Sequence, residues 1–243
     1  MLNVSKFFTY GEQVDGYSVR VLNEREARAA AGILFAVGLI GLFNAVTLGH
    51  GIFTRVYITF FTFDFLIRVL WPQYAPSLLL GRLFVRNQTP EYVGAVQKRF
   101  AWGIGLALAL PMFYVMVIDP QPNIFKIPLC IVCLTLLFLE SAFSICVGCM
   151  VYGWISKEPL ELCPGDTCTV RTKDPIQRFS PMQTFVVTLT LLGAIGAAYL
   201  YFTQLENRTL LAEKFRKAFM TQAQIDAEEL KAAEAEFEAD DDF

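Results

Sequence analysis

The chain has 243 residues, of which 55% are hydrophobic, and its formal net charge at pH 7 is −3. Several uncharged apolar runs approach twenty residues, the length that crosses a bilayer, so the sequence predicts an all-α, polytopic integral membrane protein. The sequence shows no nucleotide-binding loop, catalytic triad, haem-type histidine pair or internal repeat. This argues against an ATPase, a hydrolase, a b-type cytochrome and a repeat-built transporter. Nucleic acid is not an expected partner, because the polar segments lack clusters of Lys and Arg combined with aromatic side chains.

The N-terminal part is predicted to hold a helical hairpin. Residues 1–28 combine aromatic side chains with a charged collar, so they are expected to lie at the membrane interface. Two membrane helices are predicted at 29–47 and 52–70, and the turn between them is so short that they must run antiparallel. His50, the one histidine of the chain, lies in this turn and is expected to be a turn residue rather than a metal ligand.

The middle of the chain is predicted to alternate between the membrane and its surface. Residues 73–100 are a connection whose short amphipathic helix, opened by Pro76, is expected to lie along the headgroups. A third membrane helix is predicted at 100–118, ahead of a turn rich in helix breakers. The longest apolar run, 127–155, is predicted to be one continuous fourth helix, which completes a four-helix core over residues 29–156.

The C-terminal part is predicted to add a fifth membrane helix and an amphipathic tail. Residues 157–180 are a polar loop, and residues 181–204 contain the fifth transmembrane helix. The acidic tail, 205–243, is rich in good helix formers and carries an apolar stripe at four-residue spacing. This stripe consists of Leu211, Phe215 and Phe219. It predicts either a docking helix for a protein partner or a frayed segment that aids solubility.

The distribution of Lys and Arg predicts the orientation. These residues gather in the N-terminal segment, in the 71–100 loop and in the 156–180 loop. Because cytoplasmic loops are enriched in Lys and Arg, the N-terminus is predicted to be cytoplasmic, in a bacterial inner membrane whose lipids are the first expected partners. Five crossings then place the acidic tail on the opposite side.

Three ionisable side chains lie deep within predicted membrane helices, far from the helix starts. Asp64 and Arg68 are four residues apart and share a helical face. Glu140 lies at a similar depth in a helix that runs in the same direction, so Arg68 is predicted to bridge both carboxylates. Two interpretations remain open, a structural clamp between helices and a proton or ion relay. The clamp is favoured, because no further polar residues continue from the cluster across the membrane.

Four of the six cysteines lie in the 127–155 run. Cys130 and Cys133 have apolar neighbours and are expected to pack as small hydrophobic residues. The remaining candidates are Cys146, Cys149, Cys163 and Cys168. They are interpreted as incidental thiols, as a relay for electrons or sulfur, or as a zinc site, and no other cofactor is expected.

Short patterns occur in a characteristic order over residues 18–156. They are Asn23-Glu24 with Arg28, Asp64-Phe65 with Arg68, Tyr74-Ala75-Pro76, Lys98-Arg99-Phe100, Leu139-Glu140-Ser141, and Cys146 and Cys149 with Tyr152. In these patterns the chain resembles an uncharacterised bacterial membrane family, domain of unknown function 4395. The resemblance implies a four-helix membrane unit with no assigned activity. It also implies a hint of thiol chemistry, since some members occur near rhodanese-like or thioredoxin-like proteins.

Two functions of different classes fit these observations. The first is a non-catalytic structural or accessory subunit of a larger membrane assembly, docked through the fifth helix and the tail. The alternative is a membrane thiol protein that relays electrons or sulfur through its cysteine pairs. The accessory subunit is the favoured hypothesis. Alkylation of Cys146, Cys149, Cys163 and Cys168 before and after reduction distinguishes the two.

Overall fold

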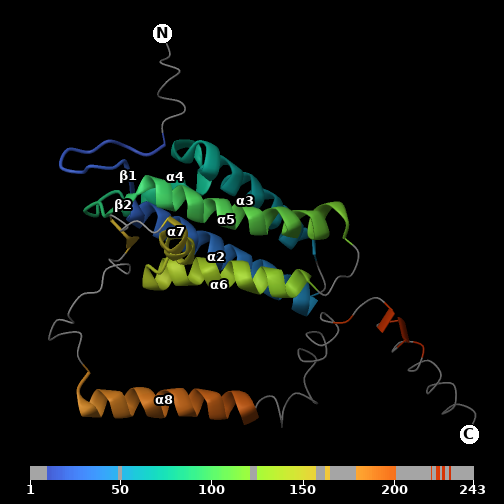
Figure 1. Ribbon diagram of the computed structural model, residues 1–243. Helices are drawn as coiled ribbons and strands as arrows, with labels where there is room; N and C mark the ends of the chain where they lie inside the picture. Colours follow the sequence, from blue (N-terminus) through green and yellow to red (C-terminus); the bar gives the residue numbers. More distant parts are fainter. Residues whose placement is uncertain are drawn as a thin grey trace, which may run out of the picture. The chain divides into compact units, whose positions relative to one another are not determined.

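The structure, a computed structural model, describes residues 10–48, 51–120, 125–156, 162–164, 179–200, 220, 223, 224, 226, 227 and 230. The chain divides into two compact units, Met1–Thr169 and Val170–Phe243, each considered by itself. The first unit is a bundle of helices with two short strands at one end (Figure 1). The described part of the second unit consists mainly of α8 (Pro181–Leu200), which corresponds to the predicted fifth helix. The mainly helical architecture is therefore confirmed.

Long apolar runs build the bundle. The first two helices, α2 (Glu24–Leu48) and α3 (Ile52–Leu70), form the predicted hairpin. The next, α5 (Ala95–Phe113), continues into a π-helical turn, η2 (Tyr114–Ile118), and precedes α6 (Lys126–Phe143). Within this bundle α2 packs against α3 and α6, and α5 packs against α3. The core between these helices contains Ala30, Ala31, Leu34, Ile58, Phe61, Phe65 and Trp102.

One end of the bundle carries short elements. Two strands that the all-α prediction missed, β1 (Val21–Asn23) and β2 (Tyr92–Gly94), pair antiparallel. They are three residues each, too short to show an alternating pattern in the sequence. The predicted short helix is present as α4 (Pro76–Val85), after a 3-10 turn, η1 (Pro72–Tyr74). It packs on α2 at Gly81, where a Cβ atom would lie 2.5 Å from the backbone oxygen of Glu26.

The predicted fourth helix is broken in two, which corrects the continuous run of 127–155. The first piece, α6, ends at Phe143, and α7 (Val147–Ser156) begins four residues later. Ser144 takes the left-handed conformation, with φ of 58°. Its amide and that of Ile145 both bond to the carbonyl of Leu139, which closes the helix. Left-handed residues commonly end helices, but Gly or Asn usually occupies that position, so serine gave no signal.

Four helices in the described residues are long and apolar enough to cross a membrane. They span Glu24–Val46, Ala95–Ile118, Lys126–Phe143 and Pro181–Leu200. α3 has a comparable length but is not among the four; it carries three charged residues, Arg55, Asp64 and Arg68. The predicted count of five spans therefore depends on how the charges of α3 are accommodated.

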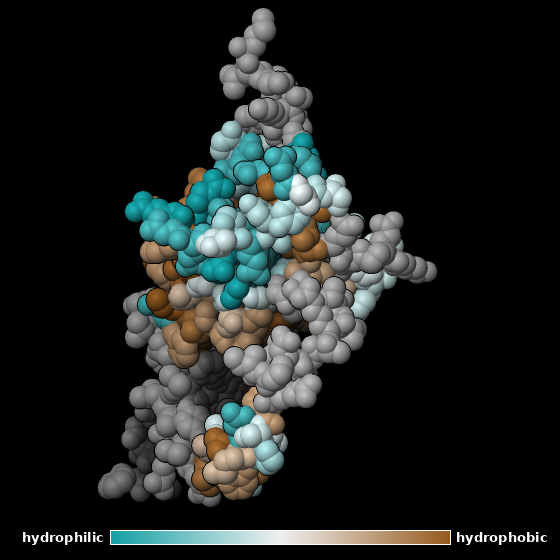
Figure 2. Space-filling model, turned by 90° about the vertical axis from the view of Figure 1, so that its left-hand side faces the viewer, coloured by the Kyte–Doolittle hydropathy of each residue, from teal (hydrophilic) through white to brown (hydrophobic). Residues whose placement is uncertain are grey.

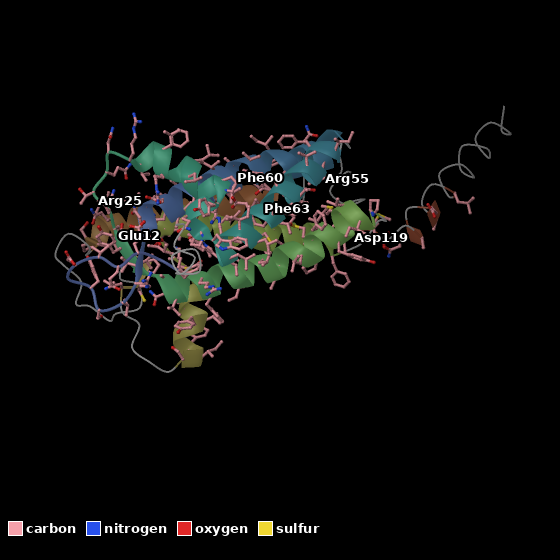
Figure 3. All side chains as sticks on the ribbon, turned by 90° about the horizontal axis from the view of Figure 1, so that it is seen from above. Glu12, Arg25, Arg55, Phe60, Phe63 and Asp119 are labelled. Carbon is pink, nitrogen blue, oxygen red and sulfur yellow. The ribbon has the colours of Figure 1, made fainter. Side chains whose placement is uncertain are left out.

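Charged residues lie at the two ends of the first unit, with apolar residues between them. Seen from above, Glu12 and Arg25 lie at one end of the bundle, Arg55 and Asp119 at the other, and phenylalanines in the middle (Figure 3). The view onto the end with β1 and β2 shows hydrophilic residues gathered there (Figure 2). This distribution matches a body with an apolar band between two polar faces.

Several predicted positions lie outside the described residues. They are His50, Cys168, Leu211, Phe215 and Phe219. The positions described between 220 and 230 are mostly helical.

Candidate functional site

The first buried charge cluster lies where α3 ends and α4 begins. Arg68 Nε donates to Asp64 Oδ2 at 2.8 Å, and Arg68 Nη2 donates to Ser77 Oγ at 2.6 Å. Asp64 also accepts from the backbone N–H of Ser77, at 2.9 Å, and from the Ser77 hydroxyl. All three side chains are buried. Asp64 therefore caps the start of α4 while it neutralises Arg68, as the four-residue spacing of Asp64 and Arg68 suggested.

Aromatic rings enclose this first cluster. The guanidinium carbon of Arg68 lies 4.8 Å from the centre of the Phe65 ring and 5.5 Å from that of Trp102. Such contacts stabilise a desolvated cation. Tyr10 donates its hydroxyl to the backbone oxygen of Arg68 at 2.8 Å, and burial raises the pKa of Tyr10 well above its usual value. Arg68 Nη1 and Trp102 Nε1 have no hydrogen-bond acceptor within the described part of the chain.

The second buried charge cluster is centred on Lys98, near the start of α5. Lys98 Nζ donates to Glu24 Oε2 at 2.7 Å. The same nitrogen lies 2.8 Å from Glu140 Oε1, within ion-pair range but outside hydrogen-bond geometry. The side chains of Lys98 and Glu24 are fully buried, and that of Glu140 is 13% exposed. Two carboxylates thus share one ammonium group, and the cluster ties the starts of α2 and α5 to the end of α6.

The predicted bridge from Arg68 to Glu140 is wrong. Glu140 pairs with Lys98, whereas Arg68 forms an ion pair with Asp64 and a hydrogen bond to Ser77. The sequence placed Lys98 in the loop before the third helix, but α5 begins at Ala95 and carries Lys98 inside. The sequence also gave no sign of Ser77 or Glu24 as buried partners. Residues 95–99 include Gln97, Lys98 and Arg99, so no apolar run indicated the earlier helix start.

A pair of thiols lies beside the second cluster, at the start of α7. Cys146 directly precedes this helix and Cys149 lies in its first turn. Both are free thiols, their Sγ atoms are 2.8 Å apart, and they are only 5% and 1% exposed. Because a disulfide needs about 2.05 Å between sulfurs, a small movement joins them. The break at Ser144 makes this possible, since it turns Cys146-x-x-Cys149 into the start of a new helix.

Close packing holds the thiol pair against α5. Gly148 lies between the two cysteines, and a Cβ atom at this position would be 2.6 Å from Cα of Ala101. Glycine therefore allows α7 to approach the α5 backbone. Cys149 Sγ lies 3.8 Å from the backbone oxygen of Gln97, one residue before Lys98.

Cys163 lies near the same place. The oxygen of Leu162 accepts from Gly94 N at 3.2 Å and from Gln97 Nε2 at 2.8 Å, which holds the 162–164 segment at the start of α5. Cys163 is buried and disulfide-bonded. Gln97 thus contacts both Cys149 and the residue before Cys163.

Two other roles were predicted for cysteines, packing in the core and binding of zinc. Cys130 and Cys133 are free and lie in the hydrophobic core, as expected of packing residues. The zinc site needed Cys163 as a thiolate, whereas it is disulfide-bonded. Within the residues that the structure describes, no group of three or more metal-binding side chains is found.

A cavity adjoins the thiol pair. It has a volume of about 110 Å³, is partly open, and lies among α3, α5, α6 and α7. Its wall is mostly apolar and includes the aromatic residues Phe61, Phe65 and Trp102. Glu140 and Cys146 contribute polar groups to the same wall. A charged cluster, a dithiol and an apolar chamber therefore meet at one place.

Comparison with curated proteins and with solved structures gave no match. A family model does match, over residues 22–157, which is more than half of the chain. These residues include both charge clusters, the Cys146 and Cys149 pair and the cavity wall. The chain therefore belongs to the family described as a domain of unknown function (DUF4395).

Proposed function

We propose that this protein relays electrons by thiol–disulfide exchange through Cys146 and Cys149 in a membrane. One observation carries the proposal: two free thiols with sulfurs 2.8 Å apart begin a helix beside an open cavity. Cysteine pairs of this spacing at the start of a helix are typical of dithiol exchange sites. Cys130 and Cys133 have the same spacing but lie in the interior of α6 and in the core, so they are not proposed to take part, although Cys133 also borders the cavity.

The exchange is a balanced two-electron transfer. Cys146 and Cys149 release two protons and two electrons and form one S–S bond, while a partner disulfide takes up both and becomes two thiols. Cys146 lines the cavity and makes the first attack, and Cys149, deeper against Gln97, resolves the mixed disulfide. The disulfide of Cys163 is the partner proposed within the chain, because Gln97 contacts both segments.

The proposed setting is a bacterial inner membrane with five crossings and a cytoplasmic N-terminus. α3 can serve as a crossing because Asp64 and Arg68 neutralise each other in the interior, while Arg55 lies near the end of the helix. In this orientation the thiols lie near the cytoplasmic face. Disulfides in a reducing compartment are usually transient and catalytic, which suits a relay better than a structural staple.

Thiol counting across a redox series tests the relay. The full chain in membranes is equilibrated with glutathione buffers of graded ratio, alkylated and analysed by mass spectrometry. We expect Cys146 and Cys149 to change together between the alkylated and the disulfide form. Cys130 and Cys133 are the matched control with the same spacing and should keep one state throughout. Identical behaviour of the two pairs would contradict the relay.

A second candidate function is the accessory subunit. It is supported by α8, whose large apolar side chains are exposed within their own unit, among them Phe185, Leu189 and Leu192. Such a surface needs lipid or another helix against it. Purification in native membrane particles, with and without residues 181–243, tests whether a partner depends on this segment.

A further inference from the structure

We propose that the cavity beside Cys146 binds a quinone with a single six-membered ring, which accepts two electrons from Cys146 and Cys149. This inference rests on the proposed relay and supplies its membrane-soluble electron acceptor. Three features of the cavity carry it: its size, an unpaired donor in its wall and the thiol of Cys146, which lines it next to Cys149.

The size and lining of the cavity select a flat apolar ring. Its volume is about 110 Å³, and an engineered protein cavity of roughly 150 Å³ is known to hold benzene. Phe61 and Phe65 offer ring surfaces against which another ring packs well. The cavity is partly open, so ring substituents and a lipid tail can extend out of it. α5 and α6, which form its walls, are apolar enough to cross a membrane, where an apolar ligand dissolves.

The unpaired donor selects a ring that carries oxygen. Trp102 belongs to the cavity wall and is 2% exposed, and its indole N–H has no acceptor among the described residues. An unsatisfied buried donor costs free energy. The N–H itself is fully buried, so the indole must shift slightly to donate to a carbonyl oxygen of the ligand. Glu140, on the same wall, is a group that can exchange a proton with a second ligand oxygen. A lipid chain would fill the space but leave the indole unpaired.

The thiols select a two-electron acceptor. Cys146 lines this cavity, and the sulfur of Cys149 lies 2.8 Å from that of Cys146. In the step that we propose, two S–H bonds break and one S–S bond forms between Cys146 and Cys149. The two electrons and two protons pass to the ring, whose two carbonyl groups become hydroxyls. An apolar ring, carbonyl oxygens and a capacity for two electrons occur together in quinones.

The experiment uses the full chain in lipid nanodiscs, reduced and then freed of reductant under anaerobic conditions. A ubiquinone with one isoprenoid unit is added, since its fully substituted ring has no open carbon for permanent thiol addition. Loss of quinone absorbance and alkylation mass spectrometry are followed together. We expect one quinone to be reduced for each disulfide formed between Cys146 and Cys149.

Two variants locate the reaction in the cavity. Val151→Phe fills the chamber from α7 and should slow quinone reduction at least several-fold. The matched control is Ile155→Phe on the same helix, which is 66% exposed and outside the cavity wall, and should react as wild type. Trp102→Phe keeps an aromatic side chain but removes the N–H, so the half-maximal rate should need roughly two- to tenfold more quinone.

The outcomes separate this inference from the relay. A wild-type protein that exchanges with glutathione but reduces no quinone overturns the quinone site and leaves the relay intact. A protein that does neither overturns both. Equal quinone reduction by Val151→Phe and Ile155→Phe places the reaction outside the cavity and also overturns the inference.

Discussion

At the residue scale, every buried charged side chain in the described part of the first unit lies beside one of opposite charge. The partner is one helical turn away or on another helix. Arg68 is paired with Asp64, and Lys98 with Glu24 and Glu140. A buried ion pair adds little net stability, because desolvation offsets its attraction. Loss of one member is costly, since the other charge remains buried without a partner. The two clusters therefore determine which helices pack against one another.

Removal of Lys98 tests this cost. Lys98→Met keeps most of the side-chain volume but leaves Glu24 and Glu140 without their cation, so we expect a loss of about 3–5 kcal/mol in the free energy of unfolding. The matched control is Arg82→Met, which breaks the exposed ion pair with Glu26, 3.0 Å long. That change should cost at most about 1 kcal/mol. Thermal unfolding in one detergent measures both.

A rescue distinguishes charge from packing. If the loss in Lys98→Met comes from unpaired carboxylates, then adding Glu24→Gln and Glu140→Gln should restore part of the unfolding temperature. An equal decrease in unfolding temperature for Lys98→Met and Arg82→Met would show that the second cluster matters no more to stability than an exposed ion pair.

At the scale of elements, the start of α7 decides whether the thiols are shielded. Gly148→Ala places a Cβ atom 2.6 Å from the α5 backbone at Ala101, which cannot yield, so α7 must move away. We expect Cys149 to react several-fold faster with N-ethylmaleimide, and stability to fall by about 1–3 kcal/mol. Peptide mass spectrometry measures the reaction at Cys149 directly.

Gly103→Ala is the control for Gly148→Ala. Gly103 lies on α5 with open space where its Cβ atom would be. Alanine there should be neutral or stabilise the helix by up to about 1 kcal/mol, with unchanged alkylation of Cys149. Faster alkylation in both variants would attribute the effect to general loosening rather than to the contact with Ala101.

The elements that the sequence predicted well are those set by one strong local signal. The apolar run 52–70 became α3 with the same bounds, and the run after Pro181 became α8. The break at Ser144 was missed, because neither proline nor glycine marks it and Glu140 is the one charged residue in the run 127–155. The resulting position of Cys146 at a helix start was therefore not predictable from a helical wheel.

The candidate site was predictable only where its partners are close in sequence. Asp64 and Arg68 were found from their four-residue spacing. The two partners of Lys98 are distant in the sequence. Glu24 lies 74 residues before it, and Glu140 lies on a later helix, α6. Their pairing depends on how α2, α5 and α6 pack, and depth along each helix could not choose between Arg68 and Lys98 for Glu140. The cavity likewise exists only after the helices are assembled.

At the scale of the whole molecule, the charge clusters, the thiols and the polar elements lie toward one end of the first unit. The clusters involve the start of α2 and α5 and the end of α3 and α6, which is also where β1 and β2 are found (Figure 1). The opposite end carries Arg55 and Asp119 (Figure 3). Because the thiols lie at one polar end, the orientation of the bundle decides which compartment the proposed relay would serve.

Labelling of single added cysteines tests this orientation. Glu12 lies at the end with β1 and β2, whereas Arg55 and Asp119 lie at the other, and all three are exposed. Because bases concentrate toward the first end, we expect it to face the cytoplasm. A membrane-impermeant maleimide should then label Arg55→Cys and Asp119→Cys in intact cells, and Glu12→Cys only in inverted vesicles. The unaltered chain reports the background, which should be low because the four free cysteines among the described residues are buried. The reverse pattern would place the thiols on the outer face, and labelling of all three from one side would mean that the bundle does not cross.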